Sequence, residues 1–332
     1  MKIAVLGAGA WGTALAISLA KQHEVTLWAR NALQVAEMAE ARCNSRYLPG
    51  FTYPSELQVE SDLSKALHSA NLSLAVVPTA GFRPLLREIA TTGLSVPLIW
   101  ACKGFESGTM KLLHEVYAEE LGHAMPCGVI SGPSFAQEVA SGLPTALTLA
   151  STDKTFAREA AAQIHSTHLR VYTSEDVIGV ELGGAVKNVM AIAAGISDGM
   201  GFGYNARAAL ITRGLAEMTR LGMALGGQPE TFMGLTGAGD LILTCTGDLS
   251  RNRSVGLKLA KGESLERVLQ ELGHIAEGVF TAREVQNLAR KMNVEMPITE
   301  AVCQVLYEGL PAKTAVEALL NRDQKAENLS RQ

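Results

Sequence analysis

Aromatic residues and cysteines are scarce in this sequence. Aromatic residues make up 5% of the 332-residue chain, and the five cysteines, at positions 43, 102, 127, 245 and 303, form no C-x-x-C pair. An odd number of cysteines at irregular spacing argues against a secreted disulfide framework and against a cysteine metal site. We therefore interpret the cysteines as small apolar residues of a core in a reducing compartment.

The sequence also lacks a strong excess of charge of one sign. It has 29 Lys and Arg against 33 Asp and Glu, which gives a net charge of −4. Proteins that bind nucleic acid or anionic lipid usually carry an excess of basic residues. This sequence has no such excess, so we expect no nucleic-acid partner. With 47% hydrophobic and 19% charged residues, the composition is typical of a folded globular protein. At roughly 150 residues per domain, the length predicts about two domains.

Long uninterrupted apolar runs are missing as well. Residues 1–21 resemble a signal peptide, but three glycines interrupt the apolar run and polar residues follow it directly. Residues 179–200 are apolar, but Glu181, Lys187, Asn188 and Asp198 interrupt them. We predict a strand and a helix for the first stretch and a buried helix for the second. We expect no transmembrane segment and a cytoplasmic location.

The first half of the chain alternates short apolar strands with helices. The predicted strands lie at residues 2–6, 24–29, 57–59, 72–77, 96–101, 127–130, 145–149 and 169–172. The predicted helices lie at residues 10–21 and 32–42, after a cap at Ser61, and at residues 109–121. Such alternation predicts an α/β, Rossmann-like domain with a mostly parallel sheet covered on both faces.

From about residue 176 the pattern becomes helical. The predicted helices lie at residues 179–196, 206–225, 257–261, 265–272, 281–291, 298–307 and 312–320. We therefore predict two domains, a dinucleotide-binding domain at 1–176 and an all-helical substrate domain at 177–332. The apolar character of the helical half favours a homodimer.

A glycine fingerprint follows the first predicted strand. Gly7, Gly9 and Gly12 have the G-x-G-x-x-G spacing and open the first helix, which is the context that a dinucleotide site requires. Gly7 permits the tight turn, Gly9 lets the backbone approach a pyrophosphate, and Gly12 allows close helix packing. The amides of Ala10 and Trp11 then point at the phosphates. The alternative is an ordinary tight turn between a strand and a helix.

The end of the second predicted strand bears on which dinucleotide binds. NAD sites usually carry Asp or Glu there, whereas this strand ends in Trp28-Ala29-Arg30-Asn31. Because a guanidinium suits a 2′-phosphate, we predict that NADP(H) is preferred and that NAD(H) is possible. The alternative for Arg30 is a solvated cation at the strand end. A neutral Asn31 beside it tempers the preference.

The helical half carries two candidate groups for chemistry. Lys187 lies beside Asn188 in an apolar helix, and a desolvated lysine can act as a general acid and base near neutral pH. Its alternative is a lysine at the solvent edge. Asp240 follows a glycine-rich turn and is either a helix N-cap or a site carboxylate near Lys187.

Other polar residues follow predicted strands or form clusters. Lys103 and the loop with Gly132 and Ser134 come after strands, where parallel sheets bind ligands. Ser250, Arg251 and Asn252 form a cluster suited to a phosphate monoester, although a surface turn explains that spacing equally well.

Eight motifs occur in one order between residue 1 and about residue 310. They are GAGAWGTAL, NSRYLPG, ACKGFE, SGPSFAQE, ELGGAVKNVMAIAAGI, GLTGAGDL, SRNRSVG and AEGVFTA. Together they resemble the NAD(P)-dependent glycerol-3-phosphate dehydrogenases of bacterial type. The resemblance implies a Rossmann-like domain followed by an all-α domain of the 6-phosphogluconate-dehydrogenase-like type. It also implies reversible hydride transfer between NAD(P)H and dihydroxyacetone phosphate, yielding glycerol 3-phosphate for phospholipid synthesis.

The resemblance assigns expected roles to particular residues. Lys187 would donate and accept the proton, and Asn188 would orient the substrate. Lys103 would contact substrate and nicotinamide, with no metal involved. The remaining substrate residues would be Gly132, Ser134, Asp240, Ser250, Arg251 and Asn252, the last two on the phosphate. The cofactor residues would be Gly7, Gly9, Ala10, Trp11, Gly12, Arg30, Lys103, Ala136, Arg251, Ile275 and Glu277.

Two other interpretations remain open from the sequence. One is a different hydroxy-acid dehydrogenase of the same 6-phosphogluconate-dehydrogenase-like group. The other is a dinucleotide sensor without catalysis, which would need no constellation of Lys187, Asp240 and Arg251. The phosphate-binding cluster at Ser250–Asn252 argues against substrates without a phosphate.

Overall fold

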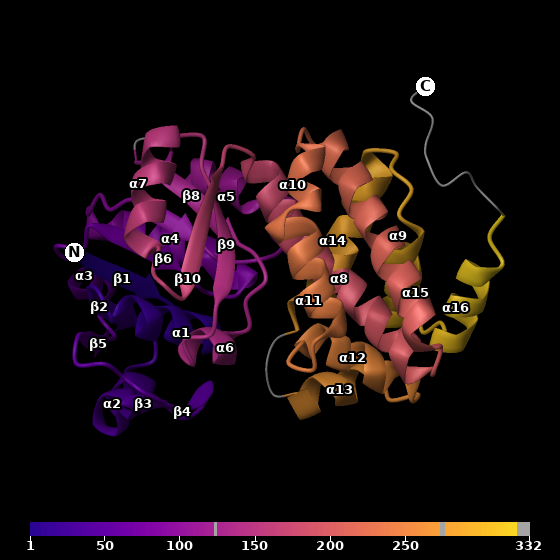
Figure 1. Ribbon diagram of the computed structural model, residues 1–332, viewed down its shortest axis with the longest axis horizontal. Helices are drawn as coiled ribbons and strands as arrows, with labels where there is room; N and C mark the ends of the chain where they lie inside the picture. The colour runs from indigo at the N-terminus through magenta and orange to yellow at the C-terminus, as the bar shows by residue number, and fades with distance from the viewer. Residues whose placement is uncertain (123–124, 273–275, 324–332) are drawn as a thin grey trace.

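The computed structural model describes residues 1–122, 125–272 and 276–323. The chain forms an N-terminal part built on a sheet and a C-terminal part built from helices, which lie side by side (Figure 1). The last strand ends at Ser174, and the first helix of the second part begins at Val177. The predicted fold class, Rossmann-like and then all-helical, is confirmed.

The sheet of the N-terminal part has eight strands in the order β10-β9-β8-β7-β6-β1-β2-β5. Every neighbouring pair is parallel except β8 with β9, so the sheet is mostly parallel as predicted. The strands are β1 (Lys2–Leu6), β2 (Glu24–Trp28), β5 (Leu57–Glu60), β6 (Leu72–Ala75), β7 (Leu98–Trp100), β8 (Cys127–Ser131), β9 (Thr145–Ala150) and β10 (Leu169–Ser174).

Helices cover both faces of this sheet, which explains why its strands are apolar on both sides. One face packs against α1 (Ala10–Leu19), α2 (Ala32–Ala41), α6 (Ala136–Ala140) and α7 (Lys154–Ile164). The other face packs against α3 (Leu63–Leu67), α4 (Thr79–Thr92) and α5 (Leu113–Leu121). A small hairpin, β3 (Cys43–Asn44) with β4 (Leu48–Thr52), lies beside α2.

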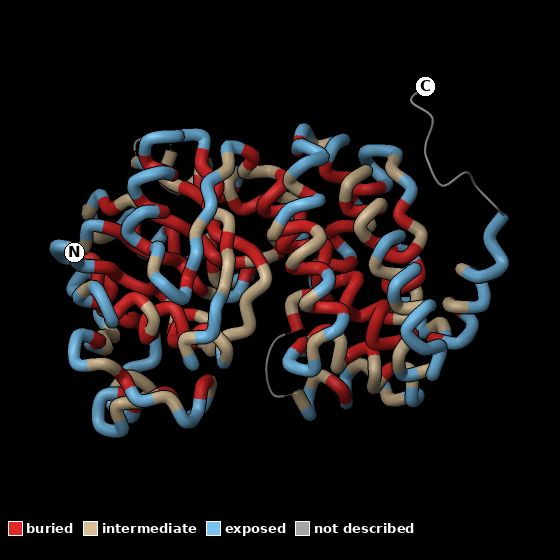
Figure 2. Tube along the Cα trace, viewed as in Figure 1, coloured by how far each residue is buried: buried red, intermediate tan, exposed pale blue. Residues whose placement is uncertain are grey.

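The C-terminal part is organised around one buried helix, α8 (Val177–Gly199), which Figure 2 shows buried along most of its length. Its apolar stretch is long enough to cross a membrane, but 83% of that stretch is buried inside the protein, as in a core helix. Around α8 lie α9 (Gly203–Ala224), α10 (Pro229–Met233), the π-helical turn Leu235–Gly239, α11 (Asp240–Thr246), α12 (Arg251–Ala260), α13 (Leu265–Leu272), α14 (Glu277–Lys291), α15 (Pro297–Tyr307) and α16 (Ala312–Leu320).

Several predicted element boundaries are wrong. Asp62 rather than Ser61 caps α3, because its carboxylate accepts the amide of Lys65 at 3.2 Å. Helix α5 begins at Leu113 instead of residue 109, since Met110 has a positive φ of 60° that no helix allows. Helix α12 begins at Arg251 instead of residue 257, because Ser250 caps it. Helices α4, α6, α7 and α10 and the β3–β4 hairpin were not predicted.

Candidate active site

The turn between β1 and α1 has the geometry of a dinucleotide site. Gly7 has a φ of +126°, and a Cβ on it would lie 2.4 Å from the carbonyl oxygen of Val76. A Cβ on Gly12 would lie 1.9 Å from the carbonyl oxygen of Gly7, so helix and strand are in close contact. A Cβ on Gly9 would meet nothing within 4 Å. The backbone at Gly9 therefore borders open space, where a pyrophosphate can approach.

The amino end of α1 completes this turn. Gly9 precedes the helix and has no side chain to cap it, so the amides of Ala10 and Trp11 lie at the positive end of the helix. These residues fit a bound dinucleotide phosphate, as the fingerprint predicts.

Arg30 follows β2 and is largely exposed. Its Nη2 lies 3.6 Å from Oε2 of Glu88 on α4. The side chain of the neighbouring Asn31 is already engaged within the protein, because its oxygen caps α2 by accepting the amides of Leu33 and Gln34. The guanidinium of Arg30 is therefore the cation at this end of β2.

Two lysines from different parts of the chain share the carboxylate of Asp240. Lys187 of α8 donates to Oδ1 of Asp240, and Lys103, which follows β7, donates to Oδ2 at 2.7 Å. Lys103 also donates to the carbonyl of Gly132 at 3.2 Å. Thr244, one turn along α11, donates to the backbone carbonyl of Asp240 at 2.6 Å. This cluster joins the sheet edge to the helical part.

The environment of Lys187 disfavours its charged form. Burial lowers the pKa of Lys187 most, and the nearby charge of Lys103 lowers it further, while the charge of Asp240 opposes both. The net direction is downward from the usual 10.5. The lysine is buried, so the alternative of a lysine at the solvent edge is excluded. A buried lysine with a lowered pKa suits proton transfer near neutral pH.

The structure excludes an N-cap role for Asp240 and a surface turn at residues 250–252. Gly239 precedes α11 at the cap position, and the Asp240 carboxylate faces the two lysines. Ser250 caps α12 by accepting the amide of Arg253 at 3.2 Å, so these residues begin a helix. The first turn of α12 holds a buried Asn252 and an exposed Arg251.

The amide of Asn252 links three helices. Its Nδ2 donates to Oδ1 of Asn188 on α8 at 2.9 Å, and its Oδ1 accepts the amide of Gly278 on α14 at 3.0 Å. Asn188, directly after Lys187, is also buried. The structure therefore brings Asn188 and Asn252 together as one polar cluster beside Lys187.

A third group of residues meets between α4 and α14. The amide of Thr79 donates to Oε1 of Glu277 at 3.4 Å, and a Cβ on Gly104 would lie 2.8 Å from Oγ1 of Thr79. Burial raises the pKa of Glu277, against the backbone hydrogen bond from Thr79 that lowers it. Within the described residues, the buried Thr79 hydroxyl has no hydrogen-bond partner. Such an orphaned donor fits a ligand group.

The other predicted residues are placed more simply. Ser134 donates to the carbonyl of Gly132 at 3.0 Å, next to Lys103, and Ala136 is the first residue of α6. Ile275 lies outside the described residues. Burial raises the pKa of the Cys102 thiol to about 12, so this neighbour of Lys103 is a neutral thiol.

Sequence reasoning missed Thr79 and Thr244. Both threonines contact predicted site residues, Glu277 and Asp240. Thr244 stands four residues after Asp240, one helical turn along α11, which is the signal that points to it. Thr79 stands directly after Pro78 and the strand predicted at 72–77, at the edge of the sheet where ligands bind.

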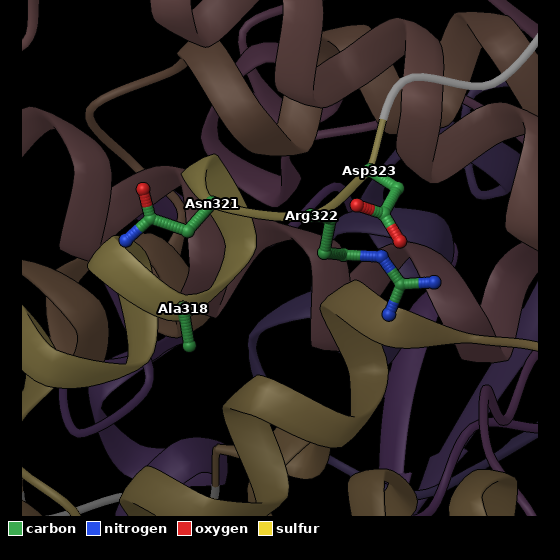
Figure 3. A pocket seen from close by; sticks show the side chains of 4 residues that line it. All are labelled: Ala318, Asn321, Arg322 and Asp323. Atoms are coloured by element: carbon green, nitrogen blue, oxygen red, sulfur yellow. The ribbon is translucent and has the colours of Figure 1, made fainter.

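Two concavities on the surface are lined by none of the predicted site residues. One lies at the end of α16, where Ala318, Asn321, Arg322 and Asp323 line it (Figure 3). Among the residues that the structure describes, no group of three or more His, Cys, Asp and Glu could hold a metal ion.

Family models match both parts of the chain. The description "NAD-dependent glycerol-3-phosphate dehydrogenase N-terminus" matches residues 2–157, and the C-terminus of the same family matches residues 176–317. The chain belongs to the NAD-dependent glycerol-3-phosphate dehydrogenase family. The resemblance of the eight motifs is thereby confirmed.

Similar proteins support this family assignment. The glycerol-3-phosphate dehydrogenase [NAD(P)+] of Nitrosospira multiformis is 62% identical over 331 residues, which cover 98% of this chain and 99% of that protein. The crystal structure of glycerol-3-phosphate dehydrogenase from Coxiella burnetii is 46% identical, with a TM-score of 0.93 over 97% of this chain and 99% of that one. The yeast enzyme GPD1 is 30% identical, with a TM-score of 0.82 over 96% and 98% of the two chains.

Proposed function

We propose that the protein reduces dihydroxyacetone phosphate reversibly to sn-glycerol 3-phosphate with NADPH or NADH. The observation that carries this proposal is the pair of lysines on Asp240, at the junction of a dinucleotide fold and a helical part. Membership of the glycerol-3-phosphate dehydrogenase family supports the substrate. The phosphate distinguishes this substrate from hydroxy acids that carry no phosphate.

Part of the proposed cofactor site is the β1–α1 turn. Gly7, Gly9 and Gly12 shape the turn, and the amides of Ala10 and Trp11 bind the pyrophosphate. Arg30 binds the 2′-phosphate, which favours NADPH over NADH. The other cofactor residues are Lys103, Ala136, Arg251, Ile275 and Glu277.

The substrate residues come from the N-terminal part and from the helices near Lys187. Arg251 and the amino end of α12 bind the phosphate, because a guanidinium and a helix N-terminus both favour an anion. Asn252 reaches it with the second N–H of its amide and also holds Asn188. Gly132, Ser134, Ser250 and Lys103 complete the pocket.

The protein's part in the reaction is proton transfer and charge stabilisation. A bound nicotinamide supplies or accepts the hydride. In the reductive direction Lys187 donates its Nζ proton to the carbonyl oxygen of the substrate, and Lys103 stabilises the negative charge that develops there. Asp240 holds both amines in place and keeps Lys187 charged before the transfer. In the oxidative direction the neutral Lys187 accepts the hydroxyl proton.

We also propose the domain assignment 1–176 and 177–332. The end of β10 at Ser174 and the cap of α8 at Asp176 support this boundary. A homodimer is supported by large apolar side chains exposed on the helical part, which include Tyr204, Met233 and Ile242. A cytoplasmic location and a supply of glycerol 3-phosphate to phospholipid synthesis complete the proposal.

To test the function, NADPH or NADH is mixed with the protein and either dihydroxyacetone phosphate or unphosphorylated dihydroxyacetone. The absorbance of the reduced cofactor then measures its oxidation. We expect oxidation that requires the phosphate and a kcat/KM that is higher with NADPH. Lys187→Ala should lose on the order of 100-fold or more in kcat, as removal of a general acid does, and should still bind NADPH. Lys313→Ala, an exposed lysine of α16, is the control.

Three outcomes contradict the proposal. Equal oxidation without the phosphate would point to another hydroxy-acid dehydrogenase of the same fold. NADPH binding without oxidation of any substrate would point to a sensor. Near-normal turnover of the Lys187→Ala variant would remove Lys187 from the mechanism.

A further inference from the structure

Glu181 is a buried carboxylate of α8 for which the proposed reaction has no use. Its Oε1 accepts the indole Nε1 of Trp100 at 2.8 Å and the backbone amide of His114 at 3.0 Å. Its Oε2 lies 2.5 Å from Nδ1 of His114. Only 2% of the Glu181 side chain is exposed. All these partners belong to the N-terminal part, so Glu181 joins α8 to β7 and α5.

This contact lies beside the two lysines of the site. Trp100 ends β7 and precedes Lys103 by three residues, and Glu181 precedes Lys187 by six residues on α8. At 1.5 Å per residue, six residues separate Glu181 from Lys187 by about 9 Å along the helix. The strand end and the helix that carry the lysines are therefore joined at two points, at Asp240 and at Glu181.

Between these two points the strand ends approach α8 closely. A Cβ on Gly184 would lie 2.8 Å from Oγ of Ser131 and 3.4 Å from Cγ of Lys103. A small change in the position of α8 would therefore move Lys187 relative to Lys103. Because neighbouring charges set the pKa of Lys187, such a move would also change its protonation.

We propose that Glu181 is a positioning residue, which fixes α8 against β7 and α5 and so sets the distance between Lys187 and Lys103. This inference rests on the proposed role of Lys187. A carboxylate without contact to the substrate would thus control the rate of proton transfer. A displacement of about 1 Å is enough to cost on the order of 100-fold in rate.

The charge on His114 adds to this contact. Burial lowers the pKa of His114, but the hydrogen bond and charge of Glu181 and the charge of Glu115 outweigh it, so the pKa is raised above 6.5. The other titratable groups that sense Glu181 are the thiols of Cys102 and Cys127, whose pKa values burial raises to about 12 and about 11. Both thiols stay neutral, so of these three neighbours of Glu181 only His114 gains a positive charge. The positive charge on His114 is fully present below 6.5 and is lost as pH rises through the raised pKa of His114.

The variant Glu181→Gln tests the proposal in the full-length protein. It keeps an acceptor for Trp100 and removes the charge. We expect NADPH affinity, measured by fluorescence, to stay within about twofold, because the β1–α1 turn is untouched. We expect kcat to fall by about tenfold or more, with a smaller change in KM for dihydroxyacetone phosphate. The alkaline limb of the kcat–pH profile should move to higher pH, because Lys187 moves away from Lys103.

The control is Glu284→Gln. Glu284 is a second buried carboxylate that accepts an amide of the N-terminal part, that of Gly108 at 2.9 Å, and it does not contact Trp100 or His114. It should leave the kcat–pH profile unchanged. If Glu181→Gln does not fold, Trp100→Phe and His114→Gln each remove one donor or the charge and should shift the profile in the same direction by less.

The proposal is overturned if a folded Glu181→Gln variant has the kcat and pH profile of the parent, whatever its melting temperature. It is also overturned if Glu284→Gln shifts the profile equally. These outcomes concern Glu181 alone, because the unsubstituted protein would still reduce dihydroxyacetone phosphate. Absence of that activity in the unsubstituted protein would instead defeat the proposed function.

Discussion

At the scale of single residues, the central feature is one carboxylate between two amines. When both lysines are protonated, Asp240, Lys103 and Lys187 together carry one excess positive charge in a buried setting. This excess favours an anionic substrate and an alkoxide-like transition state over a neutral ligand. The same excess of positive charge lowers the proton affinity of Lys187, so its proton is transferred more readily.

Asp240→Asn tests this balance of charge. The charge of Asp240 raises the pKa of Lys187, so its removal lowers that pKa further. In the proposed mechanism reduction needs protonated Lys187, so we expect kcat of the variant to decline at lower pH than kcat of the parent. Loss of orientation as well should reduce kcat by on the order of 100-fold at neutral pH. The measurement is kcat for dihydroxyacetone phosphate reduction across pH.

The matched control for Asp240→Asn is Asp248→Asn. Asp248 is 97% exposed and pairs only at the surface with Arg253. It should change neither the rate nor the profile. A profile of Asp240→Asn that moves to higher pH would contradict the assignment of Asp240 as the counter-ion of Lys187.

At the scale of elements, the β1–α1 turn contains two glycines, Gly9 and Gly12, whose missing side chains matter for different reasons. Gly12 is required by the protein itself, because a Cβ there would overlap the carbonyl of Gly7. Gly9 has a φ of −78° and faces open space, so the protein alone does not require a glycine there. In the proposed cofactor site, glycine is needed at this position because the pyrophosphate occupies the same space.

Gly9→Ala should therefore fold normally and bind NADPH poorly. We expect its melting temperature to stay within a few degrees of the parent, as for a surface change of less than about 0.5 kcal/mol. We expect Kd for NADPH, measured by fluorescence titration, to rise by about tenfold or more, since close approach of the pyrophosphate is lost. Gly12→Ala is the comparison and should lower the melting temperature. Unchanged NADPH affinity in Gly9→Ala would place the pyrophosphate elsewhere.

Elements were predicted best where a motif or a strong apolar run marked them. The strands β1 and β6 and helix α8 were predicted at nearly their true positions, because most of their residues are apolar. Helix α4 was missed, since Pro84 and two arginines disguise its apolar face. The first turn of α12 was missed because its polar residues resemble a turn, although Ser250 caps it. Polar elements next to the site are thus the hardest to predict.

At the scale of the whole molecule, the site depends on contacts that no local pattern shows. Lys103 and Asp240 are 137 residues apart in sequence and 2.7 Å apart in space. The motifs identified both residues, and the sequence left open whether Asp240 reaches Lys187 or caps a helix. Packing of α8 against the sheet decides this. Residues that only join the two parts, such as Trp100, His114 and Glu181, gave no chemical signal in the sequence.

The helical part also contains a buried carboxylate whose titration affects stability of the molecule. Glu217 of α9 accepts the amides of Ile298 at 2.6 Å and Thr299 at 3.2 Å, at the start of α15. Burial outweighs these hydrogen bonds and raises the pKa of Glu217 from 4.5 to about 7. A carboxyl with a raised pKa in the folded state stabilises fully below 4.5, and this contribution is lost as pH rises through about 7.

Glu217→Gln should remove this pH dependence while keeping one acceptor for the start of α15. At about pH 5 the variant should be less stable than the parent by about 1–3 kcal/mol, because one buried amide loses its acceptor. At about pH 8 the difference should shrink by about 2–3 kcal/mol, since ionising Glu217 then destabilises the parent and has no counterpart in the variant. Calorimetric melting of both proteins at the two pH values measures this change.

The control is Glu300→Gln. Glu300 is an exposed carboxyl of α15, the helix whose first amides Glu217 accepts, and its variant should show the parent's pH dependence. A stability difference between Glu217→Gln and the parent that stays constant with pH would mean that Glu217 is ionised in both the folded and unfolded protein, and that its hydrogen bonds outweigh its burial.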